Sequence, residues 1–321
     1  MRPEKANPIY LLHVLREYSD ETHILPMHEI LKKLRVLYDC EIDRRTVYNY
    51  IELLQTCGFD ISTYAENGAG YYLREREFEK SEIRLLVDAV CSFPFIPPDQ
   101  SRKLIQKLQQ FSSRYERKQY QHLTVVRQMR KTQNKQVFLN IELLDEAIEK
   151  QVKVRFSYLT YDAEKNLVPR RSEPYTVNPY GMVYTNEHYY LICNLCGYEN
   201  MSLYRIDRIN TLAVLNEPVN FGEKSVAADS ARAAIYAFIG QPETVEFSFD
   251  KFLLNDVIDR FGTDIDLSND GERWSVRVAV APQGMRFWAL QYLPYVEVKK
   301  PEWLRQEIIN AIQSNRYEGD T

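Results

Sequence analysis

Apolar residues recur with helical spacing in three segments near the start of the chain. The first two segments predict amphipathic helices, whose apolar faces are made by Ile9, Leu11, Leu12 and Leu15 and by Ile30, Leu31, Leu34 and Leu37. In the third segment, Val47, Ile51 and Leu54 mark the buried face of a helix. Asp43 is a favourable N-cap and Gly58 a favourable stop, so we predict this helix over residues 44–54.

A hairpin is predicted directly after these helices. Residues 60–64 and 71–73 favour strands, and the Asn67-Gly68-Ala69-Gly70 run between them is typical of a tight turn. Three helices followed by a hairpin predict a winged helix-turn-helix over residues 8–73, within a DNA-binding domain of residues 1–80.

The start of the third helix carries the candidate contacts to double-stranded DNA. A recognition helix presents its first turns to base edges in the major groove and to phosphates. The candidate DNA-binding residues are therefore Arg44, Arg45, Thr46, Tyr48 and Asn49. The alternative is a charged first turn that is merely solvated, and the order of elements around it favours DNA contact.

Residues 81–140 predict a helical linker. The predicted order is a helix over 82–90 capped by Ser81, a turn over 93–98, a second helix over 99–111 and a polar stretch to 140, with a short helix over 141–150. Lys and Arg outnumber Asp and Glu by 11 to 4 in this linker, whereas the first domain has 11 against 14. The linker either follows DNA phosphates or forms a solvated helical face that neutralises its acidic neighbours.

The remainder of the chain predicts two β-containing units. Residues 152–158 alternate between apolar and polar and predict a strand. Further strands at about 174–178, 182–185, 189–195, 201–206 and 211–215 would complete a small antiparallel barrel over 141–220. After Pro242, strands and helices alternate at 244–249, 253–261, 274–280, 285–293, 296–299 and 301–315. That order predicts a compact α+β unit over 242–317 and a multidomain α+β fold class.

Composition narrows the class of protein. A chain of 321 residues exceeds what one hydrophobic core usually organises, and 45% hydrophobic with 27% charged residues is typical of globular proteins. No apolar run approaches the roughly 20 residues of a membrane span, and the first residues lack a signal-peptide core, so we expect a cytoplasmic protein without membrane contact. The pair Cys193 and Cys196 has no second pair beside it, and neither a zinc site nor any other cofactor is predicted.

A second candidate site lies in residues 189–209, where arginines follow aromatic residues on short strands. Guanidinium groups suit phosphate or carboxylate, and aromatic rings stack on bases. The candidate ligand-binding residues are Tyr158, His188, Tyr190, Arg205 and Arg208. We expect the arginines to hold an anionic group, the tyrosines to pack on a planar group, and the histidine to lie at the rim.

Two observations limit this second site. Strict alternation places Arg205 and Arg208 on opposite faces of a strand, so they share a pocket only if the strand bends or bulges at Asp207. The alternative is a barrel in which the aromatic residues are core and one of the two arginines pairs with Asp207.

Taken together, these segments resemble the WYL-domain family of bacterial transcription regulators with a DeoR-type winged helix. The matching segments are Asp43-Arg44-Arg45-Thr46-Val47-Tyr48, Asn67-Gly68-Ala69-Gly70-Tyr71-Tyr72-Leu73, Tyr189-Tyr190-Leu191 in place of Trp-Tyr-Leu, and Tyr204-Arg205-Ile206-Asp207-Arg208-Ile209. The resemblance implies an Sm-like barrel that senses a nucleotide or oligonucleotide effector, and a C-terminal extension that contributes to dimerisation. Tyr189 and Asn49-Tyr50 depart from the family's usual residues.

Three classes of function differ in the sequence features that they require. An acidic single winged helix makes few phosphate contacts, so a homodimeric regulator is expected. An enzyme is not expected, because the five histidines are scattered and no phosphate loop, nucleophile elbow or His-Glu-x-x-His occurs. The remaining alternative is a non-transcriptional accessory protein whose barrel binds nucleic acid or a partner protein.

Overall fold

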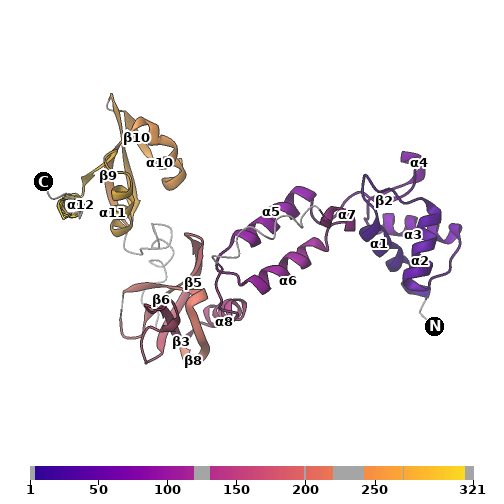
Figure 1. Ribbon diagram of the computed structural model, residues 1–321, viewed down its shortest axis with the longest axis horizontal. Helices are drawn as coiled ribbons and strands as arrows, with labels where there is room; N and C mark the ends of the chain where they lie inside the picture. The colour runs from indigo at the N-terminus through magenta and orange to yellow at the C-terminus, as the bar shows by residue number, and fades with distance from the viewer. Residues whose placement is uncertain (1–3, 119–130, 199, 220–241, 270, 315–321) are drawn as a thin grey trace. The chain divides into compact units, whose positions relative to one another are not determined.

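The computed structural model describes residues 4–118, 131–198, 200–219, 242–269 and 271–314. Contacts divide the chain into two compact units, Met1–Gln133 and Asn134–Thr321 (Figure 1). Within the described residues, no helix is both long enough and apolar enough to cross a bilayer.

The first unit opens with a short 3-10 helix, three α-helices and a small hairpin. The elements are η1 (Glu4–Ala6), α1 (Asn7–Tyr18), α2 (Met27–Tyr38), α3 (Arg44–Thr56), β1 (Ile61–Ser62), α4 (Tyr64–Asn67) and β2 (Tyr72–Leu73). Most of the apolar positions predicted from the sequence meet in one core, which includes Leu11, Leu15, Ile30, Leu34, Val47 and Ile51. The predicted face residues Ile9 and Leu37 are instead exposed. Core burial of these faces therefore positions α3 and leaves its opposite side exposed.

The hairpin differs from the prediction at its first strand. Tyr64 begins α4 instead of ending a strand, because Thr63 and Glu66 form a capping box at this turn. The predicted turn residue Gly70 lies against the backbone of Leu25, where an added Cβ would be 2.3 Å from the carbonyl oxygen. This approach allows Leu25 and Tyr71 to exchange backbone hydrogen bonds of 3.0 and 2.8 Å.

The first unit continues with α5 (Lys80–Ser92), α6 (Pro98–Gln109) and the one-turn helix α7 (Arg114–Arg117). Helices α5 and α6 pack as a hairpin around Ile83, Val87, Val90 and Ile105. The linker is helical where the sequence predicted helices, although α5 begins two residues before the predicted range and is capped by Glu79 rather than Ser81.

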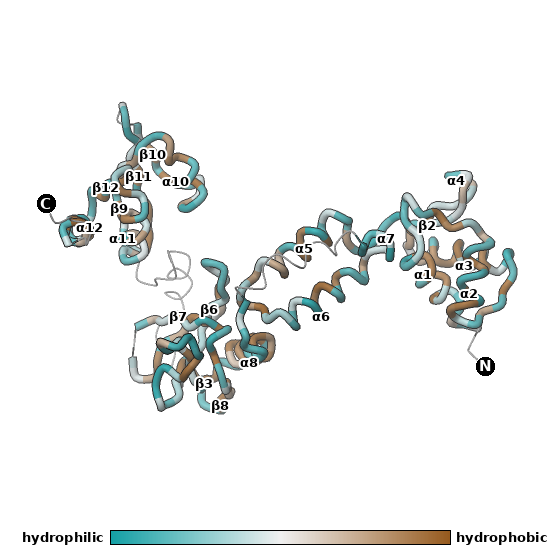
Figure 2. Tube along the Cα trace, in the orientation of Figure 1, coloured by the Kyte–Doolittle hydropathy of each residue, from teal (hydrophilic) through white to brown (hydrophobic). Residues whose placement is uncertain are grey.

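The second unit begins with α8 and a curled antiparallel sheet. The elements are α8 (Val137–Lys150), β3 (Val152–Tyr161), β4 (Leu167–Pro169), β5 (Tyr175–Thr185), β6 (His188–Leu195), β7 (Met201–Arg205), the 3-10 helix η4 (Ile206–Arg208) and β8 (Ile209–Pro218). Strand β3 pairs with β8, β5 and β4, and the order continues through β6 to β7. Helix α8, largely hydrophobic in Figure 2, contributes Leu144 and Ala147 to the core of the sheet.

Two predicted strands are one strand in this sheet. The sequence predicted separate strands at 174–178 and 182–185, with Pro179 and Gly181 between them. In the structure, β5 extends through both ranges. The register with β6 shifts between Pro179 and Gly181. A β-bulge at this point therefore allows the strand to continue through both residues.

The C-terminal part has the predicted alternation and one additional strand. Its elements are β9 (Glu243–Asp250), η5 (Lys251–Leu253), α10 (Leu254–Phe261), β10 (Asp266–Asn269), β11 (Arg273–Val280), α11 (Pro282–Gln291), β12 (Val296–Lys300) and α12 (Glu302–Gln313). The antiparallel order β10-β11-β9-β12 is that of a split βαβ sheet. Its core contains Phe247, Phe249, Trp288 and Leu304.

Candidate functional site

The first turn of α3 is exposed and has a well-formed cap. The Asp43 carboxylate accepts a hydrogen bond of 2.7 Å from the backbone N–H of Thr46. Hydrogen bonding to Thr46 lowers the pKa of Asp43, so the cap is charged near neutral pH. Arg44 and Arg45 are exposed and, among the described residues, neither forms an ion pair. The turn therefore presents two guanidinium groups to solvent.

The other predicted DNA-binding residues lie on the same helix in different surroundings. Asn49 is exposed, whereas Thr46 is half-buried. Tyr48 is 49% exposed, and its ring lies 6.4 Å from that of Tyr71, between ring centroids. Burial, with Tyr48 nearby, raises the pKa of the Tyr71 phenol to about 12. Tyr48 thus packs near Tyr71, directly before β2, so only part of its ring is available to a ligand.

The hairpin beside α3 presents little free positive charge. Arg74 donates to Asp60 at 3.1 Å and to Glu66 at 3.0 Å. Asn67 orders the turn by accepting from the backbone N–H groups of Ala69 and Gly70, at 2.7 and 2.9 Å. The tip of the hairpin is therefore ordered and close to neutral, with Tyr64 59% exposed upon it.

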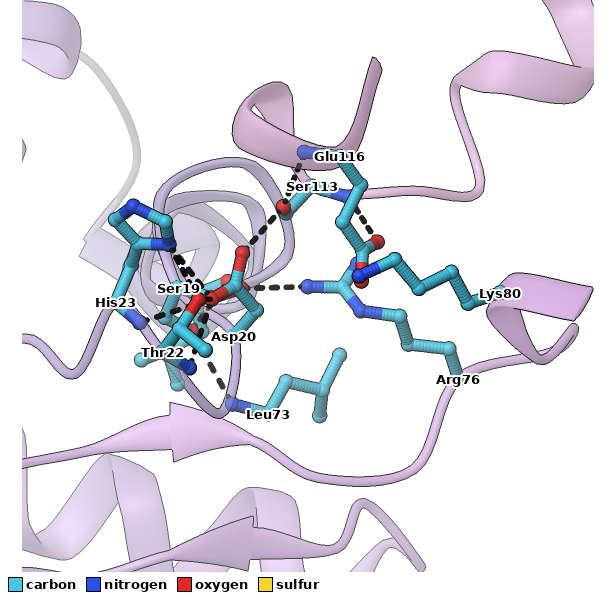
Figure 3. Close-up of polar contacts among 10 residues, drawn as sticks. Ser19, Asp20, Thr22, His23, Leu73, Arg76, Lys80, Ser113 and Glu116 are labelled. Atoms are coloured by element: carbon cyan, nitrogen blue, oxygen red, sulfur yellow. Dashed lines mark hydrogen bonds and ion pairs between the residues drawn. The ribbon is translucent and has the colours of Figure 1, made fainter. Parts of the chain in front are cut away.

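Polar contacts form a junction between the end of α1 and α7 (Figure 3). The centre of this junction is Asp20, in the loop after α1. Its carboxylate accepts hydrogen bonds from Ser113 Oγ at 2.6 Å and from the backbone N–H of Thr22 and His23 at 3.0 and 2.8 Å. Burial alone would raise the pKa of Asp20, but the hydrogen bonds from Ser113, His23 and Thr22 outweigh burial and lower it to about 2. The His23 ring also stacks on Tyr115, with 3.7 Å between centroids.

Arginines reinforce the same junction. Arg76 donates to the carbonyl oxygens of Arg16 and Ser19 at 3.0 and 2.6 Å, at the end of α1. Arg117 forms a bidentate pair with Glu17, with distances of 3.1 and 2.5 Å. The sequence interpretation missed this junction, although Ser113-x-x-Glu116 is a capping-box pattern that could have located α7.

Several basic residues of the linker are committed to internal contacts. The Lys131 ammonium donates to the carbonyl oxygens of Val90 and Phe93 and to Ser101 Oγ, each at 2.9 Å. Arg102 pairs with Asp99. The linker residues that are exposed without an ion pair in the described part of the chain include Lys103, Lys107 and Lys118. Arg127 and Arg130 lie outside the described residues.

The second candidate site is organised by the 3-10 helix η4, which ends the strict alternation of β7. Arg205 donates from Nε and Nη2 to the two carboxylate oxygens of Asp207, at 3.0 and 2.8 Å. Burial alone would lower the pKa of Arg205, but hydrogen bonding to Asp207 outweighs it and raises the pKa. The Arg205 side chain is 23% exposed and that of Asp207 5%. The alternative prediction, in which one of the two arginines pairs with Asp207, therefore holds for Arg205.

Tyr158 is a core residue, which corrects its predicted role. The residue is 8% exposed, and its ring packs edge-on against Tyr204 with 4.9 Å between centroids. Its hydroxyl accepts a hydrogen bond of 3.2 Å from the backbone N–H of Arg205. Buried among aromatic rings, the Tyr158 ring has no free face on which a planar ligand could stack.

The remaining predicted residues gather at the surface around η4. Tyr190 on β6 is the register partner of Arg205 on β7. Burial raises the pKa of Tyr190, and the positive charges of Arg205 and Arg208 oppose that shift. The Arg208 guanidinium lies over the ring of Tyr161, 5.5 Å from its centroid. His188 is half-buried with its ring 6.3 Å from that of Tyr190. Arg205 is thus paired with Asp207 beside Tyr190, and Arg208 lies over Tyr161.

Two asparagines that the sequence interpretation missed hold this turn. Asn134 Nδ2 donates to the carbonyl oxygens of Asp207 and Ile209, both at 2.9 Å. Asn140, 2% exposed on α8, donates to the carbonyl oxygen of Ile209 at 2.9 Å. A buried asparagine in an otherwise apolar helix pattern is the signal that could have identified Asn140.

Comparison with known proteins identifies part of the second unit. The WYL domain family model matches residues 140–214, and this segment of the chain is a WYL domain. The predicted WYL domain is therefore confirmed over these residues, and the winged helix-turn-helix stays a prediction. No curated protein matches the sequence.

Solved structures with similarity along the chain include two proteins. Proteasome accessory factor B/C (PafBC) of Arthrobacter aurescens has 18% sequence identity and a TM-score of 0.27, over 96% of this chain and 46% of that chain. This chain thus spans less than half the length of that protein. A CRISPR Cas-related protein has 12% identity and a TM-score of 0.38, over 96% of this chain and 82% of the other.

Proposed function

We propose that this chain is a ligand-responsive, DNA-binding transcription regulator. The observation that carries the proposal is the exposed, Asp43-capped first turn of α3, with Arg44 and Arg45 unpaired within the described residues, in a chain that also contains a WYL domain. In this proposal α1, α2, α3 and the hairpin form a winged helix-turn-helix. Helix α3 lies in the major groove of double-stranded DNA.

The elements around α3 support this role. The N-terminus of a helix carries partial positive charge and free N–H groups, which favour phosphate. Asn49, one turn beyond Arg45, has the amide geometry that suits adenine, and Arg45 suits guanine. The hairpin contributes little charge, because Arg74 is shared between Asp60 and Glu66. We therefore assign most direct contacts to α3.

The effector site is proposed at the surface formed by η4 and β6. Arg208 is the main candidate for an anionic group, because within the described residues its guanidinium contacts an aromatic ring and no carboxylate. Arg205 has Nε and Nη2 occupied by Asp207, which leaves Nη1 for a ligand. Tyr190 and His188 supply an adjacent ring and a polar rim. A nucleotide or oligonucleotide has the anionic and planar groups that match this set.

The proposed regulator is a homodimer without catalytic activity. Two exposed arginines on one α3 make few phosphate contacts, and pairing two half-sites doubles them. The accessory-protein alternative makes a different prediction, because it would keep its activity when residues 1–80 are removed.

The test is sequence-specific binding by the full chain. Duplexes selected from a random library would provide the binding site, and Arg45→Ala should weaken binding to that site by about 1–3 kcal/mol, roughly 5- to 150-fold. Lys251→Ala is the matched control, because it removes one exposed positive charge from the second unit instead of from α3. Unchanged affinity of Arg45→Ala, with normal circular dichroism, would remove α3 from the interface.

A further inference from the structure

The exposed side of α3 carries a stripe of residues that continues beyond its first turn. An α-helix turns by about 100° per residue, so Arg45, Asn49, Glu52 and Thr56 lie opposite the buried Val47, Ile51 and Leu54. All four are exposed. Thr56 Oγ1 donates back to the carbonyl oxygen of Glu52 at 2.9 Å, so its hydroxyl is engaged within the helix. Glu52 is therefore the last free polar group along the stripe.

We propose that Glu52 is a specificity-determining residue, whose carboxylate accepts a hydrogen bond from a cytosine amino group in the major groove. The inference rests on the proposed function of α3 in DNA binding. Acidic side chains pair with the N4 amino group of cytosine, as arginine pairs with guanine and asparagine with adenine. The stripe thus presents a donor, an amide and an acceptor in succession.

The spacing of the stripe suits successive base pairs. From Arg45 to Glu52 the helix rises about 10 Å, at roughly 1.5 Å per residue. Bases along one strand of a duplex are about 3.4 Å apart, so this rise covers roughly three base pairs. Each of the three side chains can therefore face a different base pair.

Glu52 also stands out by what surrounds it. Two other carboxylates near α3 are paired, Glu41 with Arg35 at 2.9 Å and Glu66 with Arg74 at 3.0 Å. In the described part of the chain, the Glu52 carboxylate has neither an ion pair nor a hydrogen bond. An unpaired carboxylate in the middle of a DNA-facing surface repels phosphates for every sequence. A cytosine amino group offsets that repulsion only at the correct base pair, which produces discrimination.

The test compares Glu52→Gln with wild type in the full chain. Binding is measured to the selected duplex and to a set of duplexes in which each base pair is changed in turn. We expect Glu52→Gln to lose roughly 5- to 150-fold of discrimination at one C·G pair, and to bind unrelated duplexes more tightly than wild type does. Glu75→Gln, which removes another exposed carboxylate of the same unit, should leave both measurements unchanged.

The possible results separate this inference from the proposed function. If Arg45→Ala loses binding while Glu52→Gln keeps full discrimination at every position, α3 binds DNA and the role of Glu52 is wrong. If wild type selects no sequence, or Arg45→Ala binds normally, DNA recognition by α3 is wrong and the role of Glu52 fails with it. Loss of discrimination by Glu75→Gln as well would also overturn the role, because the effect would then follow from net charge.

Discussion

Replacing Arg205 by alanine should destabilise the second unit. Arg205 holds Asp207 through two hydrogen bonds of 3.0 and 2.8 Å, and the Asp207 side chain is 5% exposed. Arg205→Ala leaves this carboxylate buried without its partner. Breaking a buried ion pair costs about 3–5 kcal/mol, and the 23% exposure of Arg205 reduces our expectation to about 2–4 kcal/mol.

A thermal melt of the full chain, monitored by circular dichroism, measures this effect. A unit of this size loses roughly 2–4 °C of melting temperature per kcal/mol, so we expect the transition of the second unit to fall by about 5–15 °C. Arg208→Ala is the matched control. It removes a cation–π contact with Tyr161, worth about 0.5–1 kcal/mol at an exposed site, and leaves Asp207 paired.

A double-mutant cycle separates the ion pair from other effects of truncation. Arg205→Ala combined with Asp207→Ala removes both charges, so the double variant should lose less stability than the sum of the two single variants. Additive losses, or an Arg205→Ala melt within about 1 °C of wild type, would refute the argument that this pair supports the fold.

Two further predictions concern the first unit. Gly70→Ala should destabilise it and disrupt the hydrogen bonds between Leu25 and Tyr71, because the new Cβ would lie 2.3 Å from the Leu25 carbonyl oxygen. Gly181→Ala, which meets no atom within 4 Å, should melt as wild type, and equal melting of the two variants would contradict this account. Asp20 has a folded pKa of about 2 against an ordinary 3.8, so its stabilising effect is present above pH 4 and lost as pH falls towards 2. Chemical denaturation should therefore show Asp20→Asn less stable than wild type by about 2 kcal/mol at neutral pH. This difference should shrink as the pH falls from about 4 towards 2. A difference that stays constant with pH would show that Asp20 does not titrate as described.

Elements with strong periodicity and a clear cap were predictable from the sequence. Helix α3 was predicted over residues 44–54 and extends from Arg44 to Thr56, because the Asp43 cap and the Val47, Ile51 and Leu54 face agree. Strand β10 was missed, because Asp266–Asn269 has a single apolar residue and pairs along one edge only. Backbone pairing with β11 forms this strand, and side-chain patterning contributes little to it.

The sequence predicted which types of residue form the candidate sites, but it did not predict which residues each of them contacts. Sequence placed Arg205 and Arg208 near Tyr190, yet local alternation could not show that the chain turns at η4 between the two arginines. That turn is held by Asn134 and Asn140, which lie more than 60 residues earlier in the chain. The burial of Tyr158 likewise depends on rings from other strands. Long-range contacts decide which side chains remain free for a ligand, and sequence periodicity does not record them.

Net charge is a poor guide to how the first unit meets DNA. Residues 1–80 carry 11 basic and 14 acidic side chains, which argues against a polyanionic partner. Many of these charges are paired, as for Arg35 with Glu41 and Arg74 with Asp60, and a close pair has little field beyond a Debye length of about 10 Å. The charges that a duplex would meet at α3 are the unpaired ones, Arg44, Arg45 and Glu52 in the described residues of this helix. Such a surface has modest affinity for DNA of any sequence, so recognition by one copy depends mainly on matched base contacts.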